Sequence, residues 1–143
     1  MNLFLDCEFN GFGGELLSIA LVSSGGSSFY AIVSDTKETP TEWVASNVLP
    51  LLQAFRGRGV KRPRNEIRQA LQGFLSGYRA IHIIADWPEN IVHFCKLLLT
   101  DNPGERIDTP PLTMEIVRMN STSEMPHNAL ADAEGIMISY TKA

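Results

Sequence analysis

A chain of 143 residues, 44% of them hydrophobic and 20% charged, is typical of one soluble domain over 1–143 with a buried core. No apolar run is long enough to cross a membrane, and the opening residues lack the basic flank and cleavage site of a secretion signal. The net charge of −4 argues only weakly against nucleic-acid binding, because metal sites that act on nucleic acid are themselves acidic. Cys7 and Cys95 have no metal-ligand spacing, which favours reduced thiols and a cytoplasmic location.

The first third of the chain predicts three antiparallel strands. Apolar runs at 2–9 and 15–22 are separated by a glycine-rich turn at 10–14, and a third run at 27–34 follows a Gly-Gly pair. Connections this short join neighbouring antiparallel strands, so a meander is expected.

From Thr39 onward the pattern predicts helices that alternate with strands. Pro40 opens a helix that Pro50 must bend or end, and the basic stretch 56–64 is expected to be an exposed loop. Further helices are expected at 65–75, from Pro88 and from near Pro126, and further strands at 79–86 and 112–117. The fold class is therefore α/β, with a mixed five-stranded sheet flanked by helices.

The first predicted strand carries two carboxylates one residue apart, Asp6 and Glu8. A strand alternates its faces with a period of two, so both point to one side while Leu5 and Cys7 point to the other. Neighbouring carboxylates repel each other unless a cation lies between them, and an unpaired buried charge is costly. An isolated Asp-x-Glu pair is common, so the pair becomes informative only together with other candidate residues.

A second pair, His127 and Asp132, lies near the C-terminus. Five residues of helix turn by about 500°, so the two side chains would not share a face if both were helical. The spacing favours His127 on a loop before the last helix and Asp132 within its first turns. With Asp6, Glu8 and a mid-chain Asp, this set predicts a phosphodiesterase site with two metal ions.

The order of these motifs resembles the DEDDh group of 3′–5′ exonucleases, which have a ribonuclease H-like fold. Asp6-Cys7-Glu8 matches the Asp-x-Glu motif of the first strand, and His127 and Asp132 match the His-x4-Asp motif that opens the last helix. Within that group the chain is most similar to RNase AS, a family of adenylate-preferring exoribonucleases. The likeness runs through residues 1–100 and returns at 126–134.

The resemblance implies hydrolysis of single-stranded RNA, A-rich RNA included, from its 3′ end to nucleoside 5′-monophosphates. His127 would be the general base, and two Mg²⁺ or Mn²⁺ ions would be held by four carboxylates, those of Asp6, Glu8, Asp86 and Asp132. The resemblance also implies a homodimer, and it places the 3′ nucleotide against the segment after Glu8, where the candidate contacts are Phe9, Gly11 and Leu16. Strict alternation would turn Phe9 away from the carboxylates.

The second motif departs from the family pattern. The family Asp lies just inside the helix after the fourth strand, often four residues after an Asn. In this sequence Asn90 takes that place and Asp86 stands where the Asn is found. We favour Asp86 as the fourth carboxylate, with Asn90 beside the site. There are two alternatives. In one, Asn90 is a neutral ligand, because an amide oxygen binds a hard cation without adding charge. In the other, the enzyme is weakened or altered.

Two rival functions remain open on the sequence alone. One is a nucleic-acid-binding module that has lost hydrolysis, and the other is a 3′–5′ exonuclease that acts on DNA. Basic residues in 56–64 either guide a nucleic-acid backbone or form a solvated loop. Trp43 is expected to be a core or dimer contact rather than a platform for a base.

Overall fold

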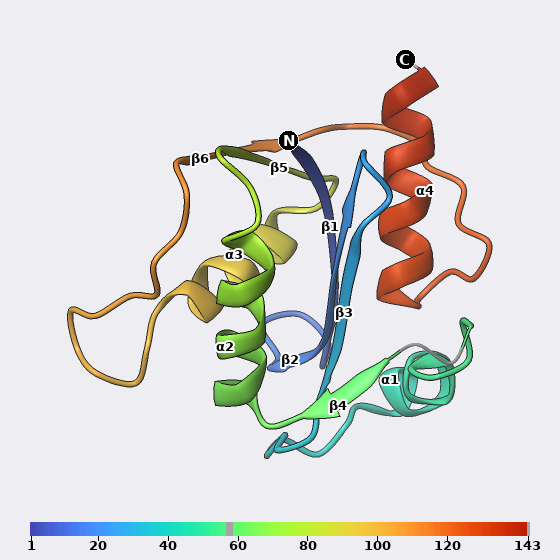
Figure 1. Ribbon diagram of the computed structural model, residues 1–143. Coiled ribbons are helices and arrows are strands. Elements are labelled where there is room, and N and C mark those ends of the chain that lie inside the picture. Colours follow the sequence, from blue (N-terminus) through green and yellow to red (C-terminus); the bar gives the residue numbers. More distant parts are fainter. Residues whose placement is uncertain (57–58, 143) are drawn as a thin grey trace.

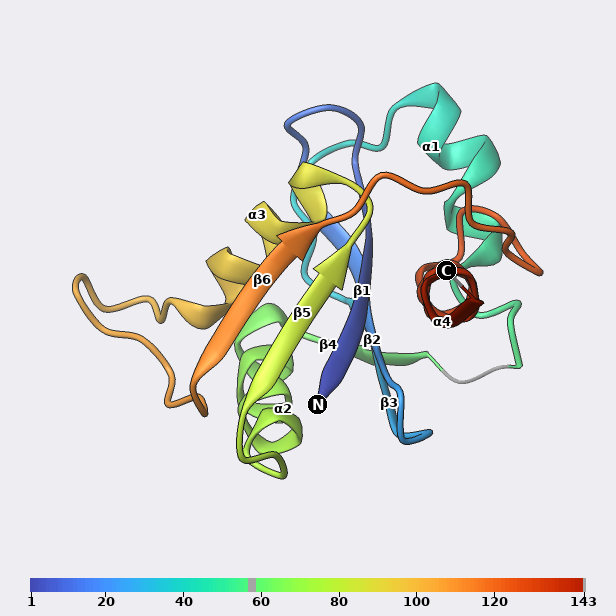
Figure 2. The same ribbon diagram turned by 90° about the horizontal axis from the view of Figure 1, so that it is seen from above.

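The apolar runs of the N-terminal third pair as the predicted antiparallel meander. In the computed structural model, which describes residues 1–56 and 59–142, β1 (Asn2–Phe9) pairs with β2 (Leu16–Ser23), and β2 pairs with β3 (Ser28–Val33). On its other side β1 pairs in parallel with β5 (Ile81–Ala85), which pairs in parallel with β6 (Leu112–Ile116). β1 therefore lies inside the sheet, with a strand on each side (Figure 2).

The sheet has six strands among the described residues, in the order β4-β3-β2-β1-β5-β6, so the expected number of five is wrong. The additional strand, β4 (Val60–Arg62), pairs in parallel with β3 at the edge of the sheet. It falls within the stretch predicted as an exposed loop, and its three residues are indeed exposed. A strand this short, between Gly59 and Pro63, has too few residues for an alternating pattern to reveal it.

Helices cover both faces of the sheet (Figure 1). They are α1 (Glu42–Asn47), the short 3₁₀ helix η1 (Leu49–Leu51), α2 (Arg64–Leu75), α3 (Pro88–Leu98) and α4 (Ala129–Lys142). α2 and α3 pack on one face and α4 on the other. As predicted, Pro50 interrupts the first helix, since α1 ends before it and the chain continues as η1. None of the described helices is long and apolar enough to cross a membrane.

The side chains of β1 alternate between these two helical layers, as their period of two predicts. Leu3, Leu5 and Cys7 are buried in the core under α2 and α3. Phe4 is buried on the opposite face, where it packs with Ile136 of α4. Asp6 and Glu8 have the parity of Phe4, so they project from the sheet towards α4.

The segment between β6 and α4 crosses closely over α4 at Gly135. A Cβ atom built on Gly135 would lie 2.7 Å from the carbonyl oxygen of Thr122 and 3.3 Å from the Cα atom of Ser123. Contacts with backbone atoms at these distances leave no room for a larger residue. Glycine at this position therefore lets the chain that leads to His127 lie against the helix that carries Asp132.

Candidate active site

Three carboxyl groups from β1 and α4 converge at the carboxyl end of β1. Asp6 and Glu8 lie on β1, Asp132 lies in the first turn of α4, and one oxygen from each lies within 4.8 Å of the other two. Asp6 is only 8% exposed, and its Oδ2 has no hydrogen-bond partner in the described part of the chain. Converging carboxylate oxygens with one unpartnered buried oxygen fit a divalent cation, because hard cations prefer oxygen ligands. We call these three residues the acidic cluster.

The acidic cluster holds protons tightly when no cation is bound. Burial, together with the charges of Glu8 and Asp132, raises the pKa of Asp6 well above its usual range. Burial and the nearby Asp132 carboxylate raise the pKa of Glu8 from 4.5 to about 8. Burial also raises the pKa of Asp132. A bound divalent cation would remove this repulsion, since an opposite charge favours the ionised form of each carboxyl group.

Asn90 donates a hydrogen bond to the acidic cluster, whereas Asp86 lies outside it. Asn90 lies in the first turn of α3, is 2% exposed, and donates a hydrogen bond from Nδ2 to Oδ1 of Asp6 at 3.1 Å. Asp86 directly follows β5 and is not a member of the cluster found among the described residues, although its charge contributes to the raised pKa of Asp6. Asn90 therefore fills the place beside Asp6, and Asp86 as the fourth metal ligand stays a prediction.

His127 precedes α4, as the spacing predicts, in an exposed turn. Its φ of 72° is in the left-handed region, which costs roughly 1–3 kcal/mol for a residue other than glycine. The backbone N–H of His127 donates to Oδ2 of Asp132 at 3.2 Å. Its imidazole meets the indole of Trp43 edge to face, with ring centroids 5.0 Å apart. The backbone of His127 is therefore tied to the acidic cluster, and its side chain lies in an exposed turn against Trp43.

Asn128 is a site-positioning residue that the sequence analysis did not single out. It is fully buried, its Oδ1 accepts a hydrogen bond from the N–H of Ala131 at 3.1 Å, and its Nδ2 donates to the carbonyl oxygen of Leu51 at 2.7 Å. The side chain thus caps α4 and ties its start to the end of η1. An Asn at the predicted helix start is a typical N-cap, which is the signal that identifies it from sequence.

Two of the three predicted nucleotide contacts lie on the face away from the acidic cluster. Phe9 stacks on His93 of α3 with ring centroids 4.9 Å apart, which confirms that alternation turns it away from the carboxylates. Leu16 is 1% exposed within the core under α2 and α3. Gly11 lies in the turn after β1 with a φ of 73°, near the Thr41 side chain that caps α1. Their roles as nucleotide contacts stay predictions.

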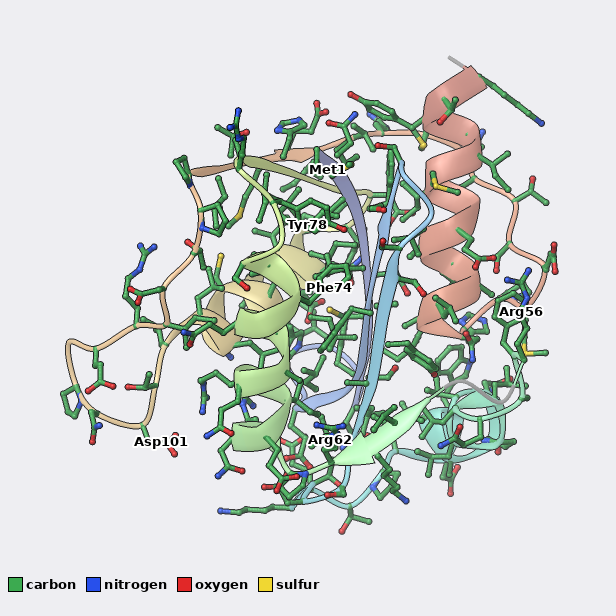
Figure 3. The ribbon with its side chains drawn as sticks, in the orientation of Figure 1. Met1, Arg56, Arg62, Phe74, Tyr78 and Asp101 are labelled. Carbon is green, nitrogen blue, oxygen red and sulfur yellow. The ribbon has the colours of Figure 1, made fainter. Side chains whose placement is uncertain are left out.

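The arginines of the basic stretch that the structure describes have different surroundings. Arg56 forms an ion pair with Glu134 of α4 at 3.1 Å, whereas Arg62 lies on β4 (Figure 3). The backbone N–H of Arg64 donates to Oδ1 of Asp35 at the start of α2. Arg58, another candidate for binding a nucleic-acid backbone, lies outside the described residues. Electrostatic guidance by this stretch remains untested.

Replacing Asn90 with Asp should tighten divalent-ion binding about 10-fold or more, the size of effect that neighbouring groups have on metal sites. The added carboxylate would lie beside Asp6, where the amide of Asn90 now donates. Calorimetric titration with Mg²⁺ measures the affinity. Asn102→Asp, in the exposed loop after α3, adds the same charge away from the site and serves as the control. Unchanged or weaker binding by Asn90→Asp would show that position 90 does not belong to the metal site.

Comparison of the chain with models of known protein families and with curated proteins gives no match. The case for a function therefore depends on the geometry of the acidic cluster and on the order of the motifs along the chain.

Proposed function

We propose that this protein is a metal-dependent 3′–5′ exoribonuclease with a ribonuclease H-like fold. The observation that carries the proposal is the convergence of Asp6, Glu8 and Asp132 around a buried carboxylate oxygen with no partner in the described structure. The resemblance predicts these residue types, in this chain order, on the first strand and the last helix. A mixed sheet whose first three strands are antiparallel, with helices on both faces, fits the same proposal.

The converging carboxylates fit a divalent cation, and the proposal includes two such ions, Mg²⁺ or Mn²⁺. Asp6, Glu8 and Asp132 would hold them, with Asp86 or Asn90 completing the set. When bound, such ions lower the pKa of a water molecule and stabilise the leaving oxygen of an in-line displacement. They would also offset the negative charge of the acidic cluster, which otherwise repels a phosphodiester.

We assign the role of general base to His127. An exposed imidazole beside Asp132 is able to accept the proton of an attacking water, which is general base catalysis. Attack on the terminal phosphate with departure of the 3′ oxygen leaves the phosphate on the 5′ oxygen of the released unit. The products are nucleoside 5′-monophosphates, and neither free cysteine takes part in the reaction.

One observation favours a second candidate, a nucleic-acid-binding module with weak or absent hydrolysis. At the position beside Asp6, Asn90 supplies an amide that adds no charge to the metal site. A DNA exonuclease is the alternative within the enzyme class. The proposal also includes a cytoplasmic location and a homodimer. The free thiols of Cys7 and Cys95 fit a cytoplasmic location, where thiols stay reduced.

The proposal is tested with a 5′-labelled single-stranded oligoadenylate in Mg²⁺, in Mn²⁺ and in EDTA. We expect a ladder that shortens from the 3′ end only when metal is present, and no ladder with Asp132→Ala. An oligodeoxyadenylate of the same length separates RNA from DNA preference. If the folded native protein shortens neither strand in either metal, the enzyme proposal fails and the binding module takes its place.

A further inference from the structure

Two of the three carboxyl groups in the acidic cluster accept a hydrogen bond from an N–H group of the protein. The side-chain amide of Asn90 donates to Asp6 at 3.1 Å. The backbone N–H of His127 donates to Asp132 at 3.2 Å. Among the described residues, the hydrogen-bond neighbours of Glu8 are only the carboxyl groups of Asp6 and Asp132. A bond between two carboxyl groups needs a proton, so Glu8 is left without a donor once a cation ionises all three.

Ser18 has the opposite deficiency, a hydroxyl group without an acceptor. It lies on β2 and is fully buried, and its Oγ has no hydrogen-bond partner in the described part of the chain. Leaving a buried hydroxyl unpaired costs free energy, and native proteins contain few such groups. An unpaired buried hydroxyl beside a functional site therefore points to an acceptor that forms in another state of that site.

Ser18 and Glu8 lie directly opposite each other in the sheet. They are register partners in the antiparallel pair of β1 and β2. Partners of this kind point to the same face with Cβ atoms about 4.5–5.5 Å apart, which a serine hydroxyl and a glutamate side chain together can span. Ser18 also has the parity of Ala20 and Val22, which pack in the core under α4. Its hydroxyl therefore lies on the face of the sheet that carries the acidic cluster.

A second acceptor near Ser18 is the hydroxyl of Tyr30. That hydroxyl donates to the carbonyl oxygen of Leu52 at 2.6 Å and accepts from Nδ2 of Asn128 at 3.4 Å. These two bonds connect β3 with the end of η1 and the start of α4, and neither needs Ser18. The group that lacks a donor is Glu8.

We propose that Ser18 is a positioning residue of the metal site, whose hydroxyl donates to the Glu8 carboxylate when divalent cations are bound. The bond would hold one oxygen of Glu8 and leave the other for the cation. Loss of a hydrogen-bond partner of a metal ligand typically lowers metal affinity about 10- to 100-fold. The inference rests on the proposed function, because it assigns to the acidic cluster the metal ions of that proposal.

Calorimetric titration with Mg²⁺ and thermal unfolding in EDTA test this role together. Ser18→Ala should weaken Mg²⁺ binding about 10- to 100-fold. Its melting temperature in EDTA should not fall, because a hydroxyl without a partner does not stabilise the metal-free fold. Ser18→Cys keeps nearly the same shape but carries a weak donor, so it should lose affinity in the same way.

Ser23 of the same strand provides the matched control. It is also buried, but its Oγ accepts a hydrogen bond from the N–H of Ser27 at 2.9 Å. It lies about 17 Å along β2 from Ser18, away from the acidic cluster. Ser23→Ala should therefore lower the melting temperature in EDTA and leave the Mg²⁺ affinity unchanged, which is the reverse of the result expected for Ser18→Ala.

The outcomes separate this inference from the proposed function. Weaker Mg²⁺ binding by both Ser18 variants, with a native protein that shortens no RNA, would support the role of Ser18 and remove the exonuclease. Native Mg²⁺ affinity in Ser18→Ala, or a melting temperature in EDTA that falls as in Ser23→Ala, would overturn the inference and leave an active exonuclease in place. A native protein that binds no Mg²⁺ would overturn both proposals.

Discussion

Replacing Asp6 with Asn should abolish metal-dependent shortening of RNA and at the same time raise the melting temperature of the metal-free protein. Asp6 is the most buried carboxylate of the acidic cluster. Loss of a ligand to catalytic metal ions removes several kcal/mol of transition-state stabilisation, so activity should fall at least about 1,000-fold.

The gain in stability follows from the same geometry. The Asp6 carboxylate is 8% exposed and is repelled by Glu8 and Asp132, and one of its oxygens has no partner in the described structure. An Asn has nearly the same shape, keeps one oxygen as an acceptor and carries no charge. Replacing unfavourable buried charge in this way stabilises proteins by about 1–4 kcal/mol.

Thermal unfolding in EDTA at pH 8, beside the oligoadenylate assay, measures both effects. Asp108→Asn makes the same chemical change at an exposed loop position and should alter neither activity nor melting temperature. Added Mg²⁺ should raise the melting temperature of the native protein more than that of Asp6→Asn, because the variant has lost a ligand. An active Asp6→Asn variant, or one less stable than the native protein in EDTA, would contradict the assignment of Asp6.

The acidic cluster was predictable because its residues follow local rules. The period of two along β1 determines that Asp6 and Glu8 share a face, and that rule holds for a strand whatever surrounds it. The spacing of His127 and Asp132 likewise allowed only one sensible arrangement at a helix start. Which helix packs on the acidic face of β1 is a tertiary feature, and no local rule predicts it. Only the resemblance to the exonuclease group placed the last helix beside the first strand.

The second motif was harder to predict because the choice between Asp86 and Asn90 depends on tertiary packing. Pro88 is the first residue of α3, so Asn90 lies in its first turn and is directed at Asp6, while Asp86 remains before the helix. The helix start at Pro88 was predicted correctly, but which of the two side chains reaches Asp6 depends on how α3 packs against β1. Trp43 is 55% exposed, so the core position expected for it is wrong, while the alternative of a dimer contact stays a prediction; a six-residue helix gives no reliable apolar face.

The metal-free protein should lose stability as the pH rises from about 5 to 8.5, and Mg²⁺ should remove that loss. The pKa of Glu8 is raised from 4.5 to about 8 in the folded protein, and burial and mutual repulsion also raise the pKa values of Asp6 and Asp132. The folded state therefore binds more protons than the unfolded state throughout this range. Each such group lowers the free energy of unfolding by up to about 1.4 kcal/mol per pH unit.

His93 has the opposite effect on the pH dependence of stability, and it determines the pH interval to measure. Burial lowers the pKa of His93 from 6.5, so its contribution to stability grows as the pH rises towards 6.5 and is nearly complete by about pH 7.5. Between pH 7.5 and 8.5 His93 therefore no longer contributes to the slope, which reports the acidic cluster together with the two thiols, whose pKa values burial raises, so the comparison with Glu8→Gln isolates the cluster. Melting temperatures in EDTA should fall over this interval, and the fall should be smaller in Glu8→Gln.

Mg²⁺ removes the loss of stability because it competes with protons for the same oxygens. Deprotonated carboxylates bind the cation, so the increase in melting temperature caused by Mg²⁺ should grow with pH in the native protein. Glu8→Gln should respond less, because it has lost one of the three charges. Two results would contradict this prediction: a metal-free melting temperature that rises between pH 7.5 and 8.5, or an increase caused by Mg²⁺ that is the same at both pH values. Either would show that Mg²⁺ does not displace protons from the three carboxyl groups.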